Sequence, residues 1–181
     1  MLKHITKLES ERLVLYPMDE SFISKNYLSW LNDNEVNRYL ETRGSYDEKK
    51  LIKFIKVSIK KKICFWAITE KKNGTHIGNI KIDQIDFYHS RGEYGVLIGD
   101  KNSWGRGYAR EASTIVIEFC FKILRLRKIT LGVVESNKKA LKLYKKLGFK
   151  VEGVFVDHGY YQNKLRNIYK MAIFNKSFFS E

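Results

Sequence analysis

The chain is poor in residues that divide or interrupt a fold. It has 181 residues, Pro17 is its only proline, and no Gly/Ser-rich or Pro-rich stretch separates one part from another. A chain of this length can bury roughly two-thirds of its unfolded surface in one core. We therefore predict a single domain over residues 1–181.

Cysteine and histidine are also scarce. Cys64 and Cys120 stand alone in apolar surroundings, without C-x-x-C spacing, and the four histidines are scattered. This pattern predicts reduced thiols in the core and no metal site. No apolar run approaches the ~20 residues of a membrane span, and the N-terminal residues lack the apolar core of a signal peptide. These absences predict a cytoplasmic protein with no membrane partner.

Acidic residues are few relative to basic ones, and the formal net charge is +14. Such an excess is typical of proteins that bind phosphate backbones. The lysines, however, are spread along expected helices rather than gathered in one arm, which favours solvated helix faces over a nucleic-acid site. The excess still suits an anionic substrate or cofactor.

Apolar periodicity predicts an alternation of helices and strands. Asp19 is expected to cap the first helix, and Ser136 or Asn137 the last, which stops at Gly148. An Asn73-Gly74 pair predicts a hairpin turn. The last helix is expected at 138–147, and further helices at 33–40, 47–60 and 109–124. The strands are expected at 9–15, 63–69, 76–82, 94–98, 128–134, 151–157 and 167–174.

The stretch 93–110 predicts a strand, a glycine-containing loop and a helix start. Gly105 and Gly107 can take positive φ and let backbone N–H groups converge, beside the positive end of the following helix. This arrangement suits a phosphate or pyrophosphate, although an ordinary βα turn would look the same. The loop has neither the Gly-Lys-Ser/Thr ending of a P-loop nor the third glycine of a dinucleotide fingerprint.

A helix crossover joins 94–98 to 128–134, so we expect these two strands to be parallel. Two motifs then resemble the GNAT superfamily of acyl-CoA N-acyltransferases: Trp-Gly-Arg-Gly-Tyr-Ala at 104–109, and Asn137 through Tyr144 to Gly148-Phe149. The Glu-x-x-Arg-Leu-Val-Leu opening at 9–15, the 30–36 segment and the aromatic Trp104 are similar to the Rim-type branch, named for ribosomal-protein N-terminal acetyltransferases.

The resemblance implies an α/β fold with a mixed, mostly antiparallel twisted sheet, a splayed parallel central strand pair and flanking helices. It also implies acetyl-CoA as the acyl donor. Leu97 and Ile98 would pair with the pantetheine arm, where a backbone N–H could stabilise the oxyanion. Asn137 would orient that arm, or would simply cap its helix. The loop that would hold the pyrophosphate comprises Trp104, Gly105, Arg106, Gly107, Tyr108, Ala109 and Arg110.

The implied reaction is direct attack of a neutral amine on the thioester. Tyr144 would protonate the leaving thiolate, since a phenol keeps its proton at neutral pH; the alternative is a core tyrosine. Glu93 is the candidate base, or a solvated surface group, and Glu135 is a reserve. His76, His89 and His158 are expected to be ordinary polar residues.

The acceptor site is expected from the N-terminal helices and the C-terminal hairpin, where aromatics and arginines suit a sugar, a base or a phosphate. Three functions stay open: an N-acetyltransferase of small amines such as amino sugars of nucleotide-sugar pathways, an acetyltransferase of (ribosomal) protein N-termini, and a non-catalytic nucleic-acid-binding module. The protein is expected to be a monomer or homodimer. The candidate acceptor residues are Trp30, Arg38, Tyr39, Glu41, Arg43 and Tyr160.

Overall fold

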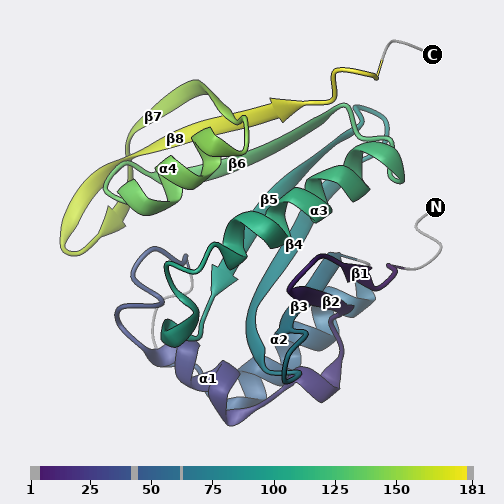
Figure 1. The fold of residues 1–181 in the computed structure, drawn as a ribbon. Helices are drawn as coiled ribbons and strands as arrows, with labels where there is room; N and C mark the ends of the chain where they lie inside the picture. Colours follow the sequence, from purple (N-terminus) through teal and green to yellow (C-terminus); the bar gives the residue numbers. More distant parts are fainter. Residues whose placement is uncertain (1–4, 42–44, 62, 179–181) are drawn as a thin grey trace. The chain divides into compact units, whose positions relative to one another are not determined.

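A computed structural model describes residues 5–41, 45–61 and 63–178 (Figure 1). The fold is α/β, and its strands follow the hydrogen-bonded order β1-β2-β3-β4-β5-β6-β8-β7, mostly antiparallel with β5 and β6 as the parallel pair. The expected fold class is therefore confirmed. The strands are β1 (Leu8–Glu9), β2 (Leu13–Pro17), β3 (Cys64–Glu70), β4 (His76–Asp86), β5 (Arg91–Ile98), β6 (Lys128–Val134), β7 (Lys150–Tyr161) and β8 (Lys164–Phe174).

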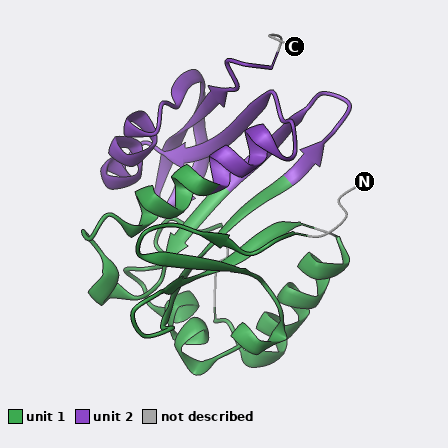
Figure 2. Cartoon of the chain, turned by 45° about the vertical axis from the view of Figure 1, so that its right-hand side comes forward, with its two compact units in different colours: residues 1–83, 95–115 green, residues 84–94, 116–181 purple. Residues whose placement is uncertain are grey.

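The chain falls into two compact units, which Figure 2 colours separately. Unit 1 comprises residues 1–83 and 95–115, and unit 2 comprises residues 84–94 and 116–181. The boundaries fall within β4, β5 and α3 (Tyr108–Lys122), so these three elements run from one unit into the other. We describe each unit by itself.

In unit 1, β1, β2, β3 and the first part of β4 pair antiparallel. The six residues Cys64–Thr69 of β3 are all buried, so both faces of this strand are covered. Helix α2 (Glu48–Lys60) is capped by the Asp47 side chain, and its Leu51 and Ile55 are fully buried. They join α1 (Lys25–Asn32) in one hydrophobic cluster, which holds the core of this unit.

Three expectations for the N-terminal segment were wrong. The strand expected at 9–15 is divided into β1 and β2, because residues 11–12 form a bend. Asp19 caps only a 3-10 turn at Glu20–Phe22, and Ser24 caps α1 through its side chain instead. Residues 33–40 form turns rather than a helix. The Asp33 carboxylate accepts the backbone N–H groups of Glu35 and Val36, at 2.8 and 3.1 Å. Such side-chain bonds offer the backbone an alternative to the helix ladder.

In unit 2, Arg91–Glu93 of β5 lie parallel to Lys128–Thr130 of β6, and β8 pairs antiparallel with both β6 and β7. Helix α4 (Lys138–Lys146) is capped by Asn137. The parallel pair was expected, although its register lies at residues 91–93 rather than 94–98. The strand expected at 76–82 is longer than predicted, because β4 continues to Asp86.

The two cysteines are free and buried, as predicted. Burial raises the pKa of the Cys64 thiol to about 12, so it stays protonated at neutral pH. In the part of the chain that the structure describes, no helix combines the length and the apolar character that crossing a bilayer requires.

Candidate functional site

The glycine loop of unit 1 follows the end of β5. The Gly99 and Asp100 N–H groups both donate to the Ile77 carbonyl, at 2.9 and 3.1 Å. The chain then makes a 3-10 turn at Lys101–Ser103 and enters α3 at Tyr108. Between them, Gly105 and Gly107 have φ of +76° and +83°, a left-handed conformation that glycine adopts without the strain of a side chain.

Trp104, at the start of this loop, anchors it to the strand before it. Its indole Nε1 donates to the Ile98 carbonyl at 2.8 Å, and its half-buried ring packs against the hydrophobic cluster of unit 1. The aromatic residue at this position therefore fixes where the loop leaves β5. The Leu97 and Ile98 residues are half-buried. The backbone here lies close to β4, because a Cβ added to Gly78 of β4 would lie only 2.3 Å from the Leu97 carbonyl oxygen.

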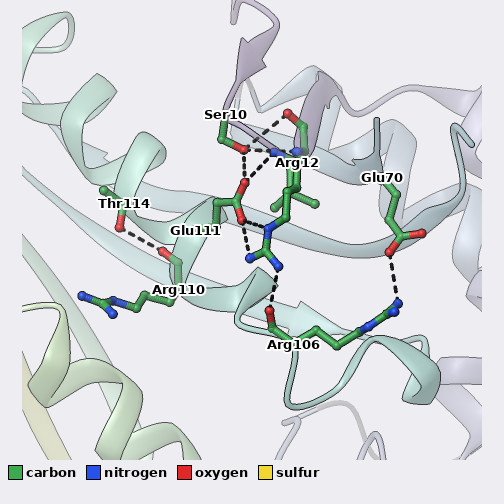
Figure 3. A network of polar contacts seen from close by, with 8 residues as sticks. Ser10, Arg12, Glu70, Arg106, Arg110, Glu111 and Thr114 are labelled. Atoms are coloured by element: carbon green, nitrogen blue, oxygen red, sulfur yellow. Dashed lines mark hydrogen bonds and ion pairs between the residues drawn. The ribbon is translucent and has the colours of Figure 1, made fainter. Parts of the chain in front are cut away.

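A charged clamp holds the other end of the loop (Figure 3). The Glu111 carboxylate, in the first turn of α3, accepts from the Arg12 N–H at 2.8 Å, the Arg12 Nε at 2.8 Å and the Ser10 hydroxyl at 2.7 Å. The Arg12 Nη1 also donates to the Arg106 carbonyl at 3.0 Å. One arginine, in the bend between β1 and β2, thus fixes both the loop backbone and the start of the helix.

The clamp keeps Glu111 charged although only 16% of its side chain is exposed. Burial acts to raise the pKa of Glu111, but the bonds from Arg12 and Ser10 outweigh it and bring this pKa below its usual value. The same arginine lies over the Tyr108 ring, with its Cζ 4.7 Å from the centroid. Arg106 in turn reaches Glu70 at 3.6 Å. Charged groups therefore surround the loop on several sides.

This geometry can receive an anion. The first N–H groups of a helix have no intrahelical acceptor, and the helix dipole places partial positive charge there. Residues 105–107 and Arg110 are exposed, whereas Tyr108 is buried and Ala109 half-buried. Exposed backbone at a helix start is the arrangement that binds phosphate groups.

Unit 2 holds Tyr144, on the face of α4 that packs inward. The ring is buried, with centroid distances of 5.9 Å to both Tyr94 and Phe149. Burial raises the pKa of its hydroxyl to about 12, so the phenol keeps its proton. Among the described residues the Tyr144 hydroxyl has no hydrogen-bond partner, which leaves it able to donate.

Glu93 and Asn137 each have a partner within unit 2. The Glu93 carboxylate lies 3.4 Å from the Lys170 ammonium and is 32% exposed. Asn137 accepts the Ala140 N–H through Oδ1 at 3.2 Å, so its side chain caps α4, and its amide nitrogen can still donate to another ligand. Glu135 is half-buried, and its backbone N–H donates to Asn167.

The candidate acceptor residues lie in different environments. Trp30 is buried, against Tyr27 and His76, which favours packing over substrate contact. The others are more accessible, or lie outside the described residues. Arg38 and Glu41 are exposed, Tyr39 is half-buried beneath the Arg38 guanidinium at 6.0 Å, Tyr160 of unit 2 is 50% exposed, and Arg43 falls outside the described residues.

The histidines differ from one another. His76 is enclosed by Phe22, Tyr27 and Trp30, with ring centroids at 5.2, 5.7 and 4.9 Å. Its Nε2 lies 3.0 Å from the Gly78 carbonyl and 2.9 Å from Asn79 Oδ1, and both acceptors require a proton on this nitrogen. His89 and His158 are exposed. Within the described residues, no group of three or more His, Cys, Asp or Glu side chains could hold a metal ion.

The roles of Arg12 and Glu111 in supporting the loop were not predicted from the sequence. Arg12 was noted only as part of the segment 9–15 that is similar to the Rim-type branch. Glu111 is typical of the acidic residues found in the first turn of a helix. The two are 99 positions apart. The one signal in the sequence was a charged residue, Arg12, directly before the apolar run at 13–15. It did not indicate which residue would be its partner.

Comparison with known proteins identifies the family. The acetyltransferase (GNAT) domain family matches residues 12–150, which is more than half of the chain and includes the glycine loop, Tyr144 and the segments of both units between them. The chain belongs to the GNAT acetyltransferases. The superfamily resemblance of the two motifs is thereby confirmed.

Individual relatives are more distant. The spermidine N(1)-acetyltransferase of Escherichia coli is 31% identical over 109 residues, or 60% of this chain and 58% of that protein, so the chain spans less than two-thirds of its length. An uncharacterized N-acetyltransferase of Bacillus licheniformis is 27% identical over 94% of this chain and 97% of its own.

The fold is also that of solved structures. Spermidine N-acetyltransferase from Vibrio cholerae, solved with CoA and spermine, has a TM-score of 0.85 at 21% identity, covering 93% of this chain and 99% of that one. Ribosomal-protein-S5-alanine acetyltransferase from Vibrio fischeri has a TM-score of 0.83 at 18% identity, covering 95% and 98%. At such identities the likeness concerns the fold.

Proposed function

We propose that this GNAT protein is an acetyl-CoA-dependent N-acetyltransferase that acetylates a primary amine of a small molecule. The observation that carries the proposal is the clamped glycine loop at the start of α3. Its two left-handed glycines and the Arg12–Glu111 clamp hold exposed backbone ready for a phosphate-bearing ligand. Family membership makes acetyl-CoA the natural occupant, and residues 1–181 would act as a single domain.

The donor would bind chiefly through backbone. The N–H groups of 105–110 would hold the pyrophosphate, with Trp104 fixing the loop and Arg106 and Arg110 adding charge. Leu97 and Ile98 would pair with the pantetheine arm as a neighbouring strand does. The amide nitrogen of Asn137, left over from its capping role, would donate to that arm. CoA bound to the Vibrio cholerae relative supports this choice of donor.

The chemistry would be direct transfer without a covalent enzyme intermediate. A neutral amine attacks the thioester carbonyl, the C–S bond breaks, and the Tyr144 phenol gives its proton to the departing thiolate. Glu93 would take the amine proton, directly or through water. The Lys170 ammonium lies beside the Glu93 carboxylate, so it would have to move away when the amine binds there. Tyr144 would regain its proton from solvent once CoA has left.

Two observations bear on the acceptor. Relatives with sequence similarity act on spermidine, which supports a small amine. The candidate acceptor residues of this chain, with Arg38 exposed near Tyr39, would instead suit an anionic amine such as a nucleotide-linked amino sugar. We also propose that the protein belongs to the Rim-type branch of the family. Because its fold is similar to that of an S5-alanine acetyltransferase, acetylation of protein N-termini is a second candidate function.

The deciding experiment is CoA release by the purified protein from acetyl-CoA. The acceptors would be spermidine, a UDP-linked and a dTDP-linked amino sugar, and a peptide with a free N-terminal alanine, with a reaction lacking acceptor as control. Turnover with spermidine or an amino sugar would support the proposal, and turnover with the peptide alone would favour the second candidate. Absence of thermal stabilisation by acetyl-CoA would overturn the assignment of the donor.

A further inference from the structure

Four lysines of unit 2 gather around one cavity. Lys138, Lys142, Lys145 and Lys146 of α4, with Leu141 and with Tyr169 of β8, line a groove of about 620 Å³. The spread of lysines along the chain predicts solvated helix faces for most of them, and these four are exposed. The structure adds that they share this groove with a half-buried tyrosine ring. We call it the α4 groove.

The charge of the α4 groove is uncompensated. In the described residues, none of the four ammonium groups has an ion pair, whereas exposed lysines elsewhere do, such as Lys101 with Asp33 at 2.6 Å and Lys122 with Glu118 at 2.6 Å. Four positive charges within one cavity repel one another. A bound polyanion would relieve that repulsion, and the +14 charge of the whole chain would draw such a ligand in.

The chemistry of the groove favours nucleic acid over other polyanions. From Lys138 to Lys146 the helix rises roughly 12 Å, so the ammonium groups form a row that can follow a chain of phosphates. Lysine acts on phosphate as a point charge, whereas planar carboxylates favour the arginine fork, which the groove lacks. Tyr169 supplies an aromatic ring against which a base can stack.

A membrane surface fits less well. Helices that bind membranes present large apolar side chains beside their basic ones. No large hydrophobic side chain is exposed on α4, since Leu141 and Tyr144 are each only 8% exposed.

We propose that the α4 groove is a binding site for single-stranded nucleic acid, in which the lysines contact phosphates and Tyr169 stacks on a base.

The proposal is tested by fluorescence anisotropy of labelled oligo(U) with the full-length protein, from 50 to 200 mM salt. K142E/K145E reverses two groove charges, and K49E/K53E makes the same change in net charge on exposed positions of α2. We expect the groove pair to weaken binding about 10-fold or more and to reduce the salt slope by roughly 1.4, as the loss of two phosphate contacts requires. The α2 pair should change affinity less than about 3-fold.

A milder pair, K142Q/K145Q, covers the risk that glutamate near the end of α4 disturbs the helix, and thermal melting checks that each variant is folded. Tyr169→Leu should weaken binding several-fold without changing the salt slope, because stacking releases no counterions. The proposal is overturned if oligo(U) does not bind, if both lysine pairs weaken it equally, or if saturating acetyl-CoA displaces it. Equal binding to anionic vesicles, lost with K142Q/K145Q, would overturn it in favour of a membrane surface.

Discussion

The glycine loop of unit 1 and the aromatic cluster of unit 2 are held by different forces. The loop depends on directed, charge-assisted bonds from Arg12 and Ser10 to Glu111. Tyr144 depends on packing against Tyr94 and Phe149. A loop that binds through backbone N–H groups must have its amides aimed, which needs directional bonds. A side chain that delivers a proton needs only a fixed ring and an undisturbed hydroxyl.

The largest effect is expected from Tyr144→Phe in the unit 2 cluster. The ring and its packing remain, but the proton for the departing thiolate is lost, so turnover should fall about 10² to 10⁴-fold. The affinity for acetyl-CoA should stay nearly unchanged. Steady-state kinetics with the preferred acceptor and calorimetric titration of acetyl-CoA measure the two quantities separately.

Tyr94→Phe is the matched control, because it removes a hydroxyl from the same cluster, and its turnover should stay within a few-fold of wild type. Unchanged turnover in Tyr144→Phe would remove Tyr144 from the mechanism. The pKa of about 12 for Tyr144 adds a pH criterion. An alkaline fall in rate well below that pH would have to come from another group.

The next effect concerns packing beneath the loop of unit 1. A Cβ at Gly99 would lie 2.0 Å from the Trp30 ring, which is buried in the hydrophobic cluster of unit 1. Gly99→Ala should therefore lower the free energy of unfolding by about 1–3 kcal/mol, as overpacking does, measured by urea denaturation. Gly105→Ala provides a comparison, because a Cβ there meets nothing and only the positive φ opposes it, at about 1–2 kcal/mol. Equal stability of Gly99→Ala and wild type would show that Trp30 can move.

Breaking the clamp should weaken donor binding. Arg12→Ala removes the bonds to Glu111 and to the Arg106 carbonyl together, so the loop amides lose their aim and the affinity for acetyl-CoA should fall roughly 10-fold, or about 1.4 kcal/mol of binding free energy. Arg12→Lys keeps the charge without the fork and should recover only part of that loss. Lys49→Ala, which removes one exposed charge far along the chain, controls for net charge. If Lys49→Ala and Arg12→Ala weakened binding equally, the clamp would have no specific role.

The contrast between the two regions also explains what the sequence could predict. Periodicity and capping residues act locally, so α2, α4 and the strand–loop–helix order around Gly105 and Gly107 could be predicted. The turns at 33–40 could not, because the Asp33 side chain competes with the helix ladder there. Tyr144 could be singled out by its motif, yet its burial against Tyr94 depends on packing between distant segments. The Arg12–Glu111 clamp depends on a contact across 99 positions, which no local pattern encodes.

The smallest effect is a pH dependence confined to unit 1. Burial among Phe22, Tyr27 and Trp30 lowers the pKa of His76 below its usual value, although its bonds to Asn79 and Gly78 oppose the shift. The unfolded chain then binds a proton more readily than the folded one, so stability is complete above about pH 6.5 and declines as the pH falls through the folded-state pKa. We expect the melting temperature to fall between pH 7.5 and 5.5, and His76→Gln, which cannot titrate, to reduce that fall. An identical pH dependence in His76→Gln would show that a group other than His76 is responsible.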